Sequence, residues 1–379
     1  MMDTNKIAQM IKDGEIKAIS LDTNVFHRHA YDLENSLLGS LGQFIGTSIK
    51  YLISDIVLNE VKAHITEECL DASRLLKRAT KALRISWIVE ENHITQSKKL
   101  LTNGKSANDI ASQRLTSYQE KTQFSVVEGD DNISVKTLIA SYFSTSAPFE
   151  QKKDKKNEFP DAIALMTLES WAKAEGTIVL LVSNDNGWKQ YCEKSSHLLC
   201  LDELAMALGL FHVEDIDLSF MFSKLMGEER SSSVKKAIER DLTLLINEWE
   251  LDPDASSNYS FEAWITYQNV ESLSFGTDGG VISSELVDAL GGEYVFSAKA
   301  YGQIQVNCEF TFEVRDSIDR DYINVGSYTL ENEFYFELDF LVTLSDKNIE
   351  QADVYNVAID QFYCGIDFGD VNPWDHSGY

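Results

Sequence analysis

The sequence is poor in features that define several classes of protein. It has only four prolines among 379 residues and no low-complexity tract, so nothing in it predicts a long disordered region. It also lacks any run of about 18 apolar residues, the length that a membrane-spanning helix needs. The first residues, MMDTNKIAQMIKDGEIK, lack the basic segment and continuous apolar core of a secretory signal. We therefore expect a globular protein in the cytoplasm.

Cysteine and histidine patterns typical of structural metal sites are also missing. The cysteines are odd in number, scattered, and never arranged as C-x-x-C, which argues against a disulfide framework and a zinc knuckle. The histidines show neither an H-E-x-x-H motif nor two residues four apart. We interpret the five cysteines as reduced thiols: Cys69, Cys192, Cys200, Cys308 and Cys364.

Positive charge is scarce, but the deficit is unevenly distributed. The net charge is −28, and residues 251–379 contain 24 acidic and four basic residues, a net of −20. The first 250 residues carry the remaining −8. A nucleic-acid partner is therefore disfavoured for the last third and remains compatible with the first part.

The first 210 residues alternate short apolar runs with helical patterns, which is typical of a parallel sheet with crossover helices. We expect strands over 15–22, 50–55, 177–183 and 196–201, and helices over 24–41, 56–70 and from Phe159 onward. Residues from about 70 to 150 are long for a simple crossover and mostly helical in pattern, so they predict a helical insertion. The expected fold class is α/β, with helices flanking a parallel sheet.

The pattern changes after about residue 212. Apolar spacing over 232–249 predicts one helix, and we expect residues 213–250 to be a helical connector between 1–212 and the rest. Residues 251–379 alternate apolar with polar side chains, are rich in aromatics, and contain Gly and Asp/Asn turn signals. They predict an acidic, mainly antiparallel β domain.

Four carboxylates end a predicted strand or begin the helix that follows it. Asp22 ends the first strand in LDTNVF, Glu60 lies one turn into the helix after the second, Asp161 lies in the first turn of EFPDAIALM, and Asp185 follows the strand in LVSNDNGW. The carboxyl ends of parallel strands meet at one sheet edge, so these four side chains are expected to converge there.

Clustered carboxylates repel one another, and burial raises their pKa unless a cation neutralises them. The natural occupant is a hard divalent ion, Mg²⁺ or Mn²⁺, bound through oxygen and able to share its remaining positions with a phosphate. Such an ion activates water and stabilises the leaving oxygen of a phosphodiester. The chemistry indicated is hydrolysis of a nucleic-acid backbone.

The same segments resemble the PIN domain nucleases, specifically the larger type with a helical insertion. The family's opening motif corresponds to LDTNVF, its acidic residue in the second crossover helix to Glu60 in LNEVK, its third motif to FPDAIALMTLES, and its strand followed by S/T-N-D to LVSNDNGW. The resemblance covers roughly residues 15–210 and keeps the family's order, and the segment 70–150 departs from the common compact form.

The resemblance implies a metal-dependent endoribonuclease with Asp22, Glu60, Asp161 and Asp185 as metal ligands. Asn24 would orient Asp22 or contact a phosphate, and Ser183 and Asn184 would be polar groups supporting the ligands.

Each carboxylate also has a structural explanation. Asp22 suits the cap of a helix beginning near Asn24, and Glu60 and Asp161 suit the positive end of a helix dipole. Asp185 lies in NDNG, a strong turn signal. We interpret Trp188 as a packing residue.

Basic side chains are expected where a substrate backbone would lie. Arg74, Lys77, Arg78 and Lys81 have spacings of three and four and form a stripe on a predicted helix, suited to phosphates. A solvated helix face explains them equally well. Four further lysines lie in the charged loop 151–158.

The functional prediction is an endonuclease that acts on RNA, with two alternatives. One is a PIN-like scaffold that binds without cutting, and the other is a nuclease for structured DNA. The acidic domain is expected to mediate contact with a regulatory protein or self-association, to restrain the nuclease, or only to add a soluble sandwich. A role as a toxin or defence effector is a hypothesis that rests on this pairing of domains.

Overall fold

The computed structural model describes residues 4–129, 133–149, 155–227, 232–276, 282–315 and 322–374. The chain divides into two compact units, Met1–Val213 and Glu214–Tyr379. Residues 151–154 of the lysine-rich loop, and the acidic stretch DSIDRD at 316–321, lie outside the described residues. Among the described residues, no helix combines the length and the apolar character needed to cross a membrane.

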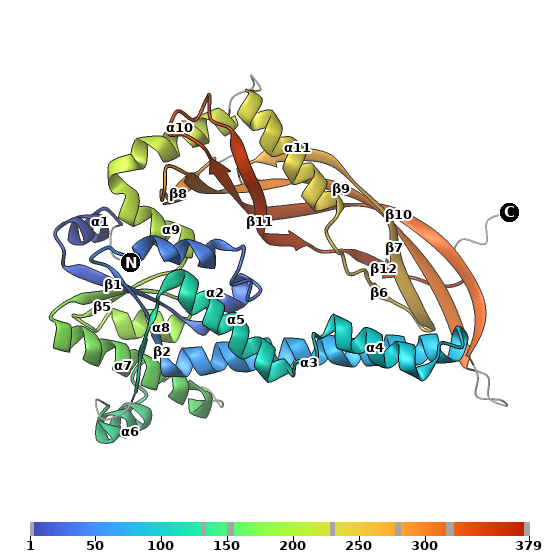
Figure 1. Ribbon diagram of the computed structural model, residues 1–379, viewed down its shortest axis with the longest axis horizontal. Helices are drawn as coiled ribbons and strands as arrows, with labels where there is room; N and C mark the ends of the chain where they lie inside the picture. The colour runs from blue at the N-terminus through green and yellow to red at the C-terminus, as the bar shows by residue number, and fades with distance from the viewer. Residues whose placement is uncertain are drawn as a thin grey trace. The chain divides into compact units, whose positions relative to one another are not determined.

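The first unit contains a five-stranded sheet in which every pairing is parallel, with the order β3-β2-β1-β4-β5 (Figure 1). Its central strands are apolar along nearly their whole length, as expected when both faces of a sheet are covered. The sheet confirms the expected α/β class. Its strands are β1 (Ile16–Leu21), β2 (Lys50–Ser54), β3 (Ser125–Val127), β4 (Ile178–Val182) and β5 (Leu198–Leu201).

Local sequence signals fix where many helices of this unit begin and end. Ser54 and Ser106 each accept a backbone hydrogen bond as N-caps, Pro160 lies in the first turn of α7, and Gly176 ends that helix with a φ of 63°. The helices are α1 (Thr4–Lys12), α2 (Thr23–Arg28), η1 (Leu37–Phe44), α3 (Asp55–Ser86), α4 (Glu91–Leu101), α5 (Ala107–Thr122), α6 (Val135–Ser144), η2 (Lys155–Glu158), α7 (Phe159–Glu175), α8 (Asn186–Cys192), α9 (Leu204–Gly209) and η3 (Leu210–Asp215).

The prediction of a single helix over residues 24–41 is wrong. The structure has the six-residue helix α2, a turn, and then the 3₁₀ helix η1, which Ser36 caps. Ala30 and Tyr31 interrupt the helix because both have a positive φ, of 49° and 51°. The chain therefore turns soon after α2.

The region from 70 to 150 is mostly helical, as expected, and also contributes the strand β3. Figure 1 shows α3 as one uninterrupted helix, whose 32 residues include the helix expected over 56–70 and continue to Ser86. At 1.5 Å per residue it is about 48 Å long. The helix α5 packs against α3, and β3 joins the sheet beside β2. This region therefore adds a strand to the sheet as well as helices.

The second unit contains long antiparallel strands in the order β11-β10-β9-β7, with β8 also paired to β9 (Figure 1). Gly302 of β9 is required by close approach, because a Cβ there would lie 1.9 Å from the carbonyl oxygen of Ser272. The elements are α10 (Ile216–Gly227), α11 (Ser233–Asn247), β6 (Asp254–Ser256), β7 (Ser260–Phe275), β8 (Ser284–Asp288), β9 (Tyr294–Arg315), β10 (Tyr322–Leu344), β11 (Val354–Cys364) and β12 (Asp367–Asp370).

The helices expected to form a connector belong to the core of this second unit. Strand residues such as Phe310 and Phe340 are fully buried, and α11 packs against the sheet through an apolar stripe. That stripe consists of Val234, Ile238, Leu242 and Ile246. Residues 213–250 are therefore not a separate connector, because their apolar face completes a core that the sheet alone would leave exposed.

Replacing Ile238 by Ala should destabilise the second unit. Ile238 is fully buried, so its truncation is expected to lower the free energy of unfolding by about 2–5 kcal/mol. Hydrogen–deuterium exchange of peptides from β9 and β10 measures this loss in the second unit specifically. Leu244→Ala is the control, because Leu244 lies on the same helix and is 55% exposed. Equal exchange in the two variants would contradict the assignment of α11 to the core.

Candidate active site

Asp22 follows β1 directly and is almost completely buried, with 5% of its surface exposed. It occupies the N-cap position of α2, but its side chain makes no capping hydrogen bond. Its Oδ2 instead accepts a hydrogen bond of 2.6 Å from the Ser183 hydroxyl. The capping explanation of this residue therefore does not account for the direction of its carboxylate.

Ser183 connects Asp22 to the loop after β4. It is fully buried, and its Oγ accepts hydrogen bonds from the Asn24 side chain at 3.2 Å and from the Asp185 backbone amide at 3.0 Å. Asn24 therefore acts on Asp22 through Ser183. Asn184 is exposed between Ser183 and Asp185. Because β1 and β4 are neighbours in the sheet, the hydroxyl fixes the relative position of two strand ends.

Glu60 lies in the second turn of α3 and is partly buried. Its Oε2 accepts a hydrogen bond of 2.6 Å from the hydroxyl of Thr23, the residue after Asp22. This contact brings the beginning of α3 to the beginning of α2. The explanation of Glu60 as a solvated helix residue leaves this contact unexplained.

Asp161 lies in the first turn of α7, where its carboxylate accepts a hydrogen bond of 2.9 Å from the indole nitrogen of Trp188. The Trp188 ring is fully buried, so the expectation of a packing role holds but omits this hydrogen bond. Burial raises the pKa of Asp161 to about 6, the Trp188 hydrogen bond opposes that rise, and the charges of Glu60 and Asp185 add to it.

Asp185 is exposed and caps α8, since its Oδ1 accepts a hydrogen bond of 3.0 Å from the backbone amide of Trp188. The same residue therefore orients the helix that supplies the indole for Asp161. The capping hydrogen bond uses only Oδ1. It fixes the orientation of the carboxylate, and Oδ2 takes no part in the cap. The turn explanation is correct locally and does not conflict with a second role.

The four carboxylates influence one another electrostatically. Burial raises the pKa of Asp22 to about 7, the Ser183 hydrogen bond lowers it, and the negative charges of Asp161 and Asp185 raise it further. Glu60 acts in the same way on Asp161. Residues separated by more than 160 positions in the sequence thus lie close enough to oppose one another's ionisation.

The donor set fits a hard divalent cation, although the side chains are not arranged around one. In the part of the chain that the structure describes, no three His, Cys, Asp or Glu side chains are grouped closely enough to hold an ion. Oxygen ligands and an unfavourably buried charge are the conditions that favour Mg²⁺ or Mn²⁺.

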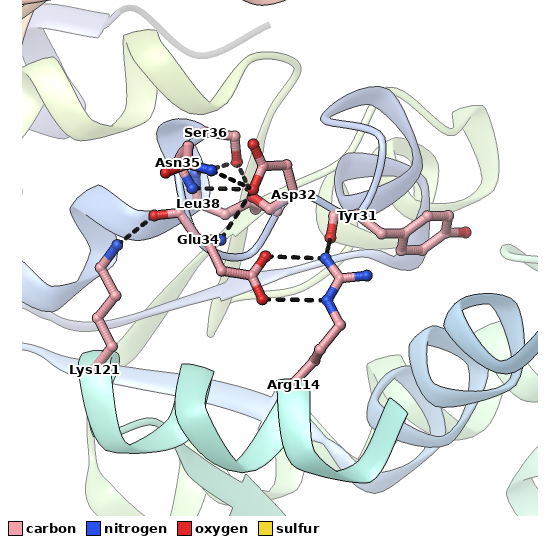
Figure 2. Close-up of polar contacts among 8 residues, drawn as sticks. All are labelled: Tyr31, Asp32, Glu34, Asn35, Ser36, Leu38, Arg114 and Lys121. Atoms are coloured by element: carbon pink, nitrogen blue, oxygen red, sulfur yellow. Dashed lines mark hydrogen bonds and ion pairs between the residues drawn. The ribbon is translucent and has the colours of Figure 1, made fainter. Parts of the chain in front are cut away.

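The loop between α2 and η1 is held by α5, as Figure 2 shows. Arg114 donates hydrogen bonds of 3.1 and 3.0 Å to the two carboxylate oxygens of Glu34, and a bond of 2.6 Å to the carbonyl oxygen of Tyr31. Lys121 donates to the carbonyl oxygen of Glu34 at 2.7 Å. These contacts hold Ala30 and Tyr31 in left-handed conformations that each cost roughly 1–3 kcal/mol.

The four basic residues of the expected substrate stripe are all exposed and all lie on α3. Arg74 forms an ion pair with Asp71, so part of its charge is already neutralised. Lys77, Arg78 and Lys81 form no ion pair with any of the described residues. The stripe is a feature of the same continuous helix that carries Glu60.

Two residues in the site were not among those expected from the sequence. Thr23 was visible within the DTN motif, but its Glu60 contact depends on the meeting of two helices. Trp188 lies five residues beyond the LVS strand end, and nothing local to it indicates a bond to Asp161. Both contacts are tertiary, so no sequence spacing would have revealed them.

The raised pKa of Asp22 predicts a specific pH dependence of stability in the absence of divalent ions. Its pKa rises from 3.8 to about 7 on folding, so the stabilising contribution of the protonated form is complete below about pH 4 and is lost as the pH rises through 7. The shift corresponds to at most about 4 kcal/mol. Thermal unfolding in EDTA at pH 5 and pH 8 measures the effect.

Asp22→Asn should flatten this pH dependence, because an amide does not ionise. Mg²⁺ or Mn²⁺ should restore stability to the unmodified protein at pH 8 and have less effect on the variant. An identical pH dependence in both proteins would show that Asp22 is not the group responsible.

Comparison with known proteins agrees with this arrangement. A family model described as PIN domain matches residues 19–188, a segment that begins in β1, ends in α8 and includes all four carboxylates. No curated protein and no solved structure matches the chain. The PIN domain is a nuclease fold that is generally metal-dependent. Residues 19–188 of this chain therefore match the PIN domain family.

Proposed function

We propose that the protein is a divalent-metal-dependent endoribonuclease that hydrolyses RNA phosphodiester bonds at the Asp22, Glu60, Asp161 and Asp185 carboxylates. The observation that carries this proposal is the desolvated Asp22. A carboxylate with 5% exposure, a pKa of about 7 and two acidic neighbours is costly as a structural element. A bound cation would neutralise this buried charge, so the free energy that its burial costs would be recovered on metal binding.

Distinct tasks follow for the residues of the site. Asp22, Glu60, Asp161 and Asp185 would hold Mg²⁺ or Mn²⁺, which when bound supplies an activated water and neutralises charge on the phosphate. Ser183 and Thr23 each donate a hydrogen bond to one oxygen of a ligand carboxylate, Asp22 and Glu60 respectively. Trp188 does the same for Asp161. Such supporting hydrogen bonds orient ligands and adjust their basicity.

The basic stripe on α3 supports a nucleic-acid substrate. Arg78 follows Glu60 by 18 residues, which is five turns of an ideal α-helix, so both lie on the same side of α3. The rise along the axis is about 27 Å. A strand whose scissile phosphate lies at Glu60 can follow this side of the helix toward Lys77, Arg78 and Lys81. We assign RNA over DNA on the PIN resemblance.

A partner role is proposed for the second unit. Its sequence beyond residue 251 carries a net charge of −20, which opposes direct binding to a polyanion. We assign it contact with a regulatory protein or with another copy of the chain. The toxin or defence hypothesis extends this proposal, and growth arrest on induced expression, absent for Asp161→Asn, is its test.

Cleavage by the purified full-length protein tests the proposed function. Single-stranded and structured RNA, with matched DNA, should be incubated with Mn²⁺, with Mg²⁺ and with EDTA. We expect metal-dependent RNA cleavage that falls by more than roughly 100-fold in Asp22→Asn and Asp161→Asn, since losing only the groups that support metal ligands costs about 10–100-fold.

Asp13→Asn is the matched control, because Asp13 is exposed and precedes β1 at the opposite end of the strand from Asp22. Cleavage of DNA in preference to RNA would replace the ribonuclease assignment with a structure-specific DNA nuclease. Metal-dependent binding without cleavage of either nucleic acid would favour the scaffold alternative.

The basic stripe predicts a change in salt dependence. Each phosphate contact to a single strand contributes a slope of about 0.7 to the plot of log affinity against log salt concentration. Replacing Lys77, Arg78 and Lys81 by Ala should therefore reduce the slope by about 2. Fluorescence anisotropy with labelled single-stranded RNA between 50 and 200 mM salt, roughly the range over which phosphate-dependent binding falls steeply, measures it.

The charge-matched control replaces Lys6, Lys17 and Lys194, which are all exposed and lie outside α3. If the control reduces the slope as much as the stripe variant does, overall charge and not the stripe determines the affinity.

A further inference from the structure

Beside Glu60 lies a group of rings that the proposed reaction does not use. Tyr31 is stacked on His64, with ring centroids 5.5 Å apart and planes at 21°. His27 meets the same tyrosine edge to face, at 6.0 Å and 87°. The Tyr31 ring is 3% exposed, while both imidazoles are exposed. The two histidines therefore form the accessible surface of a cluster centred on a buried tyrosine.

The position of the cluster relates it to the carboxylates. His27 is on α2, five residues after Asp22, and His64 is on α3, one turn after Glu60. The charges of Glu68 and Glu60 both help to raise the pKa of Tyr31 to about 12, after the larger effect of burial. The cluster therefore lies within electrostatic reach of Glu60. It also precedes the basic stripe along the same helix.

The backbone of Tyr31 adopts an unfavourable conformation in placing its ring against the two histidines. Tyr31 has a φ of 51°, which is unfavourable for a bulky side chain, and its carbonyl is held by Arg114 (Figure 2). Its hydroxyl is buried, and no hydrogen-bond partner for it is found among the described residues. A buried hydroxyl without a protein partner is uncommon in a native core, so filling space does not by itself explain this tyrosine.

We propose that His27 and His64, supported by Tyr31, form a stacking subsite for an unpaired nucleobase adjacent to the scissile phosphate. This inference rests on the proposed nuclease function and adds a positioning element to it. Single-stranded RNA is recognised largely by stacking of splayed bases on aromatic rings, histidine included. One face of His64 is occupied by Tyr31, and its exposure leaves ring surface for a base.

The surrounding charges favour a base over a phosphate as the occupant. Glu68 carries a carboxylate close enough to interact electrostatically with both histidines, and Glu60 lies one turn before His64. A phosphate placed beside Glu68, which is not one of the proposed metal ligands, would be repelled, whereas a neutral base would not. The phosphates are instead provided for by the basic stripe farther along α3.

Binding in the absence of cleavage tests the subsite. Full-length Asp161→Asn protein in EDTA is titrated with labelled oligoadenylate RNA and with an abasic strand of the same length, with anisotropy as the readout. His27→Leu combined with His64→Leu should weaken binding of oligoadenylate by about 5- to 150-fold, the range that stacking on one residue supplies. Binding of the abasic strand and the salt slope should not change.

Two further variants separate stacking from packing. Replacing both histidines by Phe should preserve the preference for oligoadenylate, because an aromatic face remains. Leu covers Tyr31 as well as His does, so thermal stability should be similar in the Leu and Phe variants. His93→Leu, an exposed histidine on α4, should behave as the unmodified protein.

Three outcomes would overturn the subsite. They are no preference for the base-bearing strand in the parent protein, equal loss in the Leu and Phe variants, or a reduced salt slope in the Leu variant. The last would indicate phosphate contact. None of these measurements requires catalysis, so failure of the subsite is distinguishable from absence of cleavage in the Mn²⁺ and Mg²⁺ assay.

Discussion

Desolvation of the Asp22 carboxylate is the constraint on which the rest of the site depends. Water cannot stabilise a charge that is 5% exposed, so protein hydrogen bonds, a proton or a cation must do so. The protein supplies one strong donor, the Ser183 hydroxyl, and places further carboxylates nearby, which worsens the problem. A site designed for stability would do the reverse. The combination of too few donors and too many acids is stable at neutral pH only with a proton or a cation, and this is the physical link between fold and proposed chemistry.

The sheet order makes this combination possible. Strand β1 is central, with β4 on one side and β2 on the other, so the residues after all three strands lie at one edge. Asp22 follows β1, Ser183 and Asp185 follow β4, and Glu60 is carried by the helix that begins where β2 ends. Asp161 arrives from a different direction, on the first turn of α7, and its indole donor belongs to α8. Only a parallel sheet brings these segments to the same place from such distant sequence positions.

The sequence predicted the parts of this arrangement that follow from periodicity and topology. Buried strands ending in Asp22 or leading to Asp185 were recognisable, and parallel connectivity then required convergence of the carboxylates. Contacts between separate helices, such as Thr23 with Glu60, could not be deduced, because their register depends on packing. The left-handed Tyr31 was likewise invisible, since its local sequence continues a helical pattern until tertiary contacts override it. The apolar stripe on α11 correctly predicts a buried face. It does not indicate which core covers that face, so the sequence alone suggests a connector.

The insertion around α5 has a role in the energetics of the site. Two consecutive left-handed residues cost roughly 2–6 kcal/mol together, and nothing in their own sequence offsets that cost. Arg114 contributes a bidentate contact to Glu34, but with side chains 28% and 48% exposed this pair alone is worth about 1 kcal/mol or less. The bond from Arg114 to the Tyr31 carbonyl and that from Lys121 to the Glu34 carbonyl must add to it. Both donors come from α5, which packs on α3, the helix that carries Glu60. The helices added to the compact fold therefore support the loop that follows Asp22, and a change that loosens α5 acts on the carboxylate site without touching it.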